Sequence, residues 1–83
     1  MAATNNSLIR LFRELIVMSE SPTEVFLANR FVCRAERGDT IWTAYEWREV
    51  KLLLTAVIRL TNSSDDAFLA DELRSTLELR AVV

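Results

Sequence analysis

Glycine and proline, the two residues that most often interrupt regular backbone structure, each occur once in this 83-residue chain, as Gly38 and Pro22. A small β-sandwich or β-barrel needs a turn about every 8–12 residues, and its turns draw heavily on these two residue types. The sequence therefore favours long helices joined by short loops. We expect an all-α fold, a small bundle of three or four helices in a single domain that spans residues 1–83.

The first expected helix covers about residues 8–18. Its apolar residues fall on one wide arc of a helical wheel, opposite the charged ones; they are Leu8, Ile9, Leu11, Phe12, Leu15 and Ile16. Asn6 or Ser7 is the expected N-cap, because each offers a side-chain oxygen to the free N–H groups of the first turn. Residues 1–6 are then expected to form a flexible tail.

A second helix is expected over residues 22–37. Ser21 can accept a hydrogen bond from the backbone N–H near Glu24, and Glu24 can reach back to the N–H of Ser21. Pro22 occupies the first helical position, where a missing N–H costs nothing. The expected buried face consists of Ala28, Phe31, Val32 and Ala35. Gly38 predicts a left-handed stop at the end of this helix.

The segment after Gly38 leaves an alternative open. Strand-forming residues are frequent over residues 39–45, so an α+β fold with a hairpin spanning about residues 31–45 is conceivable. We favour the helical interpretation because Thr43 and Glu46 have the spacing of a second capping box, which restarts a helix at that point.

A third helix is expected from about Ala44 to Leu60. Its polar residues occupy only a narrow arc of the wheel; they are Arg48, Lys51, Thr55 and Arg59. A helix that is apolar on most sides is buried on most sides, so this helix is predicted to be the centre of the domain or a subunit interface.

A fourth helix is expected to follow the loop that begins at Thr61. Ser63 or Ser64 is its predicted N-cap, and Asp65 and Asp66 lie in its first turn, where the helix dipole favours negative charge. Its narrow apolar stripe consists of Leu69, Ala70, Leu73 and Leu77.

The chain lacks the side chains on which most catalytic and metal sites are built. It has no histidine and one cysteine, Cys33, so neither a cysteine–histidine nucleophile nor a histidine–cysteine zinc site can form within it. A phosphate-binding loop needs several glycines. We therefore expect no catalytic residue, no cofactor and no metal, and we do not expect an enzyme.

The expected location is a reducing, cytoplasmic one, because a lone cysteine provides no disulfide framework. No signal peptide is visible, since charged residues interrupt the apolar stretch near the start. The longest apolar stretch, near residues 52–58, is too short for a membrane span, which needs about 20 residues.

An apolar surplus predicts a binding surface. Apolar residues make up 51% of the chain, and the mean hydropathy is +0.14. Phe26, Phe68 and Leu79 fall away from the main apolar faces of their helices, which argues for a second buried surface. We expect a small protein–protein interaction module, such as a regulator, inhibitor, adaptor or assembly factor, that self-associates as a homodimer. The residues predicted for its surface are Leu8, Phe12, Phe26, Leu53, Val57 and Phe68.

Two other functions stay open. Arg30, Arg34 and Arg37 lie on one stripe of the second expected helix, and such a stripe can bind anions or nucleic acid. Nucleic acid is not the favoured partner, because the net charge is −2 and the helix after Gly38 is too apolar for a DNA groove. The other alternative is a structural subunit of a larger assembly.

Overall fold

The computed structural model describes residues 2–38 and 43–81, and the side chains of residues 6–38 and 43–77. These residues form four α-helices: α1 (Ala2–Met18), α2 (Pro22–Glu36), α3 (Ala44–Leu60) and α4 (Ser64–Ala81). The prediction of a small all-α bundle is confirmed. The alternative hairpin over residues 31–45 is wrong, because residues 31–36 belong to α2 and residues 44–45 to α3.

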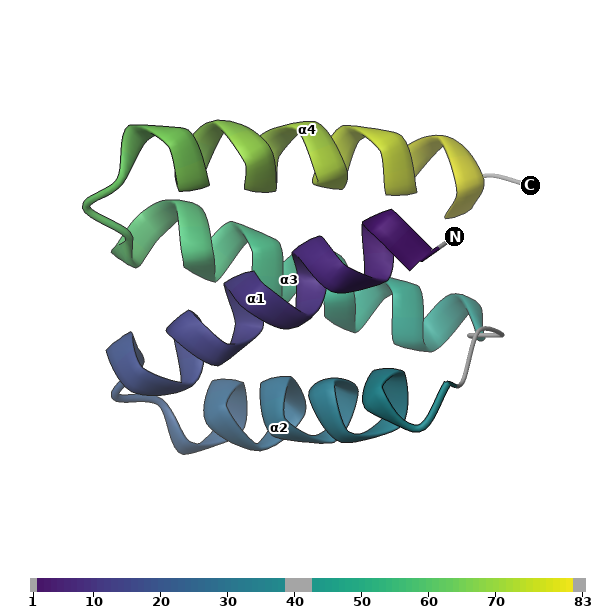
Figure 1. Ribbon diagram of the computed structural model, residues 1–83, viewed down its shortest axis with the longest axis horizontal. Coiled ribbons are helices and arrows are strands. Elements are labelled where there is room, and N and C mark those ends of the chain that lie inside the picture. Colours follow the sequence, from purple (N-terminus) through teal and green to yellow (C-terminus); the bar gives the residue numbers. More distant parts are fainter. Residues whose placement is uncertain (1, 39–42, 82–83) are drawn as a thin grey trace.

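The helices are arranged with α2 and α4 on the outside and α1 and α3 between them, and α1 crosses obliquely over α3 (Figure 1). The packing is most extensive between α1 and α2 and between α3 and α4. Both α1 and α3 touch every other helix, whereas α2 and α4 make no contact within the described residues. The third helix therefore has a central position, which is one of the two alternatives that its apolar wheel predicts.

The core is apolar and is built from all four helices. Its fully buried members include Phe12, Leu54 and Ala70, each 0% exposed. The rings of Phe12 and Phe31 meet edge to face, with their centroids 5.0 Å apart and an interplanar angle of 79°, which is a favourable aromatic geometry. Among the described side chains no polar or charged residue is buried, so burial of apolar surface supplies most of the stability.

The start of α1 corrects one prediction. The helix begins at Ala2, so residues 2–6, predicted as a tail, are helical. The periodicity that predicts the helix begins only at Leu8, the first buried residue, because the preceding residues Ala2–Ser7 offer no large apolar side chain. A helix can extend by a turn or more without such a signal once its buried part has nucleated it.

Of the two hydrogen bonds predicted to cap the start of α2, one forms as predicted and the other has a different partner. Ser21 accepts a hydrogen bond from the N–H of Glu24 at 3.4 Å, as predicted. The N–H of Ser21, however, donates to the hydroxyl of Ser19 at 3.1 Å, and that hydroxyl donates to Glu24 at 2.6 Å. Ser19 thus relays the contact that the sequence assigns directly to Glu24.

The remaining helix ends follow their sequence signals. Gly38 has a φ of +89° and closes α2 with a hydrogen bond from its N–H to the carbonyl of Ala35 at 3.1 Å. Thr43 and Glu46 form both halves of the predicted capping box at the start of α3. Ser63, one of the two candidates, accepts from the N–H of Asp66 at 3.2 Å and caps α4.

Candidate protein-interaction surface

The structure separates the six residues predicted for a binding surface into two groups. Four of them, Leu8, Phe12, Leu53 and Val57, are at most 1% exposed and belong to the core. Their placement on a surface is corrected for a physical reason: periodicity identifies the apolar side of a helix, but not whether that side faces its own chain or another one. Phe26 and Phe68 are on the surface, 64% and 72% exposed.

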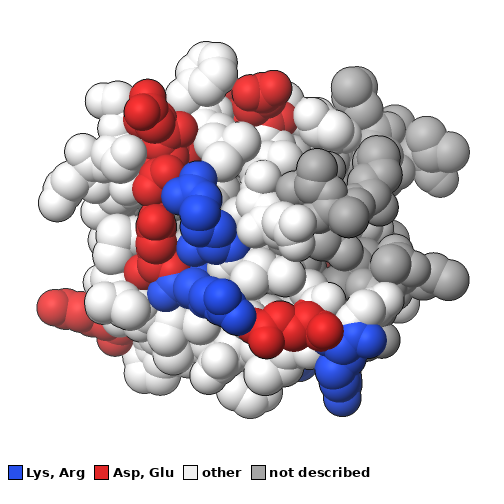
Figure 2. Space-filling model, viewed as in Figure 1, with Lys and Arg blue, Asp and Glu red and all other residues white. Residues whose placement is uncertain are grey.

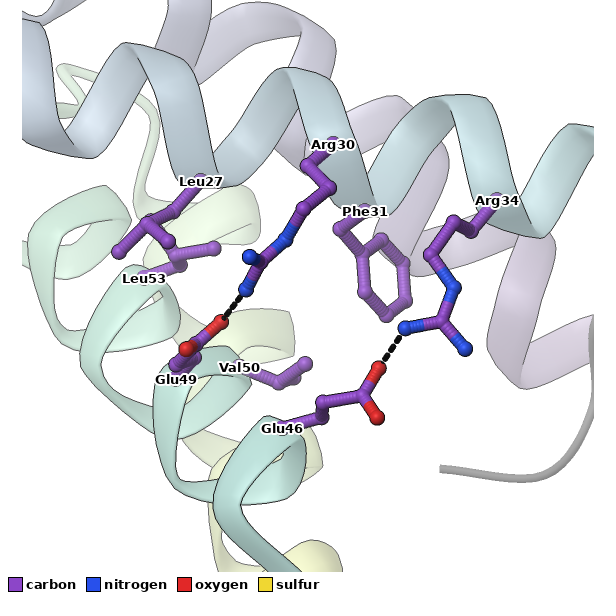
Figure 3. A pocket seen from close by; sticks show the side chains of 8 residues that line it. All are labelled: Leu27, Arg30, Phe31, Arg34, Glu46, Glu49, Val50 and Leu53. Carbon is purple, nitrogen blue, oxygen red and sulfur yellow. Dashed lines mark hydrogen bonds and ion pairs between the residues drawn. The ribbon is translucent and has the colours of Figure 1, made fainter. Parts of the chain in front are cut away.

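The predicted arginine stripe of α2 faces α3. Figure 3 shows Arg30 hydrogen-bonded to Glu49 and Arg34 to Glu46, over the apolar floor that Leu27, Phe31, Val50 and Leu53 provide. The space left among these side chains is about 10 Å³, no more than one water molecule needs. Arg37 is the exposed C-cap residue of α2. Two of the three arginines therefore hold α2 to α3, and no ligand fits between them.

The face over α1 mixes the two signs of charge. Arg10 binds Asp66 at 3.0 Å and Glu14 at 3.4 Å, and Arg13 pairs with Glu36 of α2. Figure 2 shows basic and acidic side chains side by side on this face. A hydrogen bond to Asp66 raises the pKa of Glu14, and contacts with Glu14 and Arg10 lower that of Asp66. This face joins α1 to α2 and α4 and presents no segregated charge.

The outer side of α3 presents a different pattern. Tyr45, Arg48, Leu52, Thr55 and Arg59 follow one another at spacings of three and four residues, so they line one side of the helix. We call these five residues the α3 outer stripe. Tyr45 is 69% and Leu52 is 67% exposed, although the opposite side of the same helix is buried.

Leu52 forms a ridge between two grooves. The groove between α3 and α4 has a volume of about 480 Å³ and is lined by Arg48, Lys51, Leu52, Thr55, Arg74 and Ser75. The groove between α2 and α3 has a volume of about 270 Å³, and its lining includes Leu27, Leu52, Ala56 and Arg59. An apolar ridge with a groove on each side can interdigitate with the side chains of another helix.

Cations predominate around this ridge. Arg48 and Lys51 form no ion pair with any described residue. Arg74 is held by Asp71 at 2.7 Å and by the hydroxyl of Thr55 at 3.2 Å. The chain as a whole has a net charge of −2, so this surface is locally opposite in sign.

Arg59, at the far end of the α3 outer stripe, is tied to the start of α2. It donates to the carboxylate of Glu24 at 2.9 Å. The hydroxyl of Ser19 and, after it, Arg59 lower the pKa of Glu24, because both stabilise the ionised carboxylate. Glu24 thus fixes the edge of the groove between α2 and α3.

The sequence prediction missed Leu52, although a signal for it was present. Leu52 lies four residues after Arg48 and three before Thr55, so it borders the narrow polar arc of α3, next to residues expected to face solvent. Of the three aromatic residues near the start of α3, Tyr45 is exposed and Trp47 packs partly buried against the core. Trp42 lies outside the described residues.

Among the described side chains, those of residues 6–38 and 43–77, no group of three cysteine or acidic residues converges as a metal site. No helix within residues 2–38 and 43–81 combines the length and the apolar content that crossing a membrane requires. No protein-family model, curated protein or solved structure matches the chain.

Proposed function

We propose that this protein is a small protein–protein interaction module that binds through the α3 outer stripe. The observation that carries the proposal is Leu52, a leucine 67% exposed on the central helix and bordered by two grooves. Full burial of an exposed leucine is worth about 1.5–3 kcal/mol, and a partner that covers Leu52, which is 67% exposed, would gain part of this free energy. The role is that of a regulator, inhibitor, adaptor or assembly factor that acts by occupying a partner's surface.

The nucleic-acid alternative has less support. It relies on Arg30, Arg34 and Arg37, and two of these are engaged with Glu49 and Glu46 across the α2–α3 contact. Freeing them for phosphate would leave two glutamates next to the bound polyanion, which like-charge repulsion disfavours. A structural subunit of a larger assembly would use the same α3 outer stripe, but its partner would be permanent.

Site-specific photo-crosslinking tests the proposal. A photoreactive phenylalanine analogue replaces Leu52 in the full chain, in the cells that produce it. The matched control carries the analogue in place of Val17, which is more exposed, at 86%, but lies at the end of α1. We expect discrete protein adducts from position 52 and none from position 17. Equal adducts from both positions, or none from position 52, would contradict the proposal.

A further inference from the structure

The outer side of α4 carries a second stripe with its own exposed apolar residue. Asp65, Phe68, Glu72 and Ser75 follow at spacings of three and four residues, and we call them the α4 outer stripe. Phe68 is 72% exposed. The segment over residues 64–73 contains four acidic residues and no basic one.

Two of these four acidic residues remain available to a partner. Asp66 is paired with Arg10, and Asp71 with Arg74. Asp65 and Glu72 are exposed and form no ion pair with a described residue. The α4 outer stripe is therefore an exposed phenylalanine flanked by unpaired carboxylates.

The two outer stripes complement each other in charge. On α3, an exposed leucine lies among cations, of which Arg48 and Lys51 are unpaired within the described residues. On α4, an exposed phenylalanine lies between two carboxylates. The stripes also lie on neighbouring helices, and the groove between α3 and α4 is lined by Leu52 of one and Ser75 of the other.

We propose that the partner on the α3 outer stripe is a second copy of this chain, bound through its α4 outer stripe. The inference rests on the proposed function and names its partner. A two-fold axis gives two identical contacts, α3 of each copy against α4 of the other, and closes the assembly as a dimer. Leu52 then packs near Phe68 of the other copy. Pairing α3 with α3, or α4 with α4, would bring like charges together.

The test is a charge-reversal experiment on the full chain, read as solution mass by light scattering over a dilution series. The first variant combines Arg48→Glu with Lys51→Glu, and the second combines Asp65→Lys with Glu72→Lys. The wild type is expected at twice the 9.5 kDa chain mass, with dissociation promoted by salt. Each variant alone sets like charges against each other at both contacts, so it is expected at the mass of a single chain.

The mixture of the two variants is the decisive arm. In a heterodimer, the reversed α3 stripe meets the reversed α4 stripe, and the two unchanged stripes meet each other. Charge complementarity returns at both contacts, so the mixture is expected to regain the dimer mass. Simple destabilisation by mutation predicts no such recovery.

Other results would overturn the pairing. One such result is a wild type that is monomeric at every concentration, and another is a dimer that persists in either variant. The others are wild-type assemblies of more than two chains, and folded variants that do not regain the dimer mass when they are mixed. Circular dichroism checks that each variant folds. If a double variant does not fold, a single change takes its place: Lys51→Glu for the α3 variant and Glu72→Lys for the α4 variant. A monomeric wild type that still cross-links another protein from position 52 would remove the second-copy partner and leave the proposed function. If the wild type is monomeric and position 52 also gives no protein adduct, both the second-copy partner and the proposed function are removed.

Discussion

At the scale of the residue, Gly38 is the position where the backbone itself limits the side chain. Its φ of +89° lies in a region that residues with a Cβ rarely adopt. A Cβ placed there would meet no atom within 4 Å. The restriction at Gly38 is therefore one of backbone conformation, with no contribution from crowding.

Gly38→Ala is expected to lower the free energy of unfolding by about 1–2 kcal/mol, the cost of a left-handed conformation for a residue with a Cβ. Urea denaturation measures this change. Gly38→Asn is the matched control, and it should cost less, because asparagine tolerates this conformation better. Equal losses for the two variants would show that the backbone conformation is not the cause.

At the scale of the element, the helices could be predicted to different degrees. The starts of α2 and α3 could be predicted because Ser21 and Thr43 cap them through hydrogen bonds to residues three positions later. Such contacts depend only on the local sequence. The predicted start of α1 is misplaced, because the predicted caps Asn6 and Ser7 lie inside the helix. The exposure of Leu52 and the burial of Leu53 and Val57 depend on which helices lie opposite, and local sequence does not encode that.

The contact between Glu24 of α2 and Arg59 of α3 predicts that the free energy of unfolding depends on pH. Ser19 and Arg59 lower the pKa of Glu24, so ionised Glu24 stabilises the folded chain. This stability is fully present above the unfolded-state value, about 4.3, and is lost as the pH falls through the lower folded-state pKa. The difference in unfolding free energy between wild type and Glu24→Gln should therefore be largest near neutral pH and should shrink under acid.

Urea denaturation at stepped pH values, together with NMR titration of the Glu24 carboxyl, measures this effect. Glu20→Gln is the control, because Glu20 is exposed and has no hydrogen bond or ion pair with a described residue. A Glu24→Gln difference that stays constant from neutral pH to pH 3 would show that the Ser19 and Arg59 contacts do not act through ionisation.

At the scale of the whole molecule, stability depends on α3, since it packs against the other three helices. Leu54 is 0% exposed, and Leu52, two residues away, is 67% exposed. Leu54→Ala should cost about 2–5 kcal/mol, because it opens a cavity in the core. Leu52→Ala should change the free energy of unfolding by only about 0.5 kcal/mol in the monomer.

Thermal and urea denaturation at high dilution compares these two variants. If Leu52→Ala costs as much as Leu54→Ala under conditions where the chain is monomeric, then Leu52 is a core residue. The α3 outer stripe would then lose its apolar ridge.

The pairing of α1 with α2 and of α3 with α4 has a consequence for how the chain acquires its structure. The closest packing joins helices that are neighbours in sequence, and such low contact order is typical of proteins that fold in microseconds to milliseconds. A ribosome adds only about 5–20 residues per second. The first two helices therefore have seconds in which to associate before the last two emerge. During synthesis this helix pair exposes the part of α1 that α3 later covers.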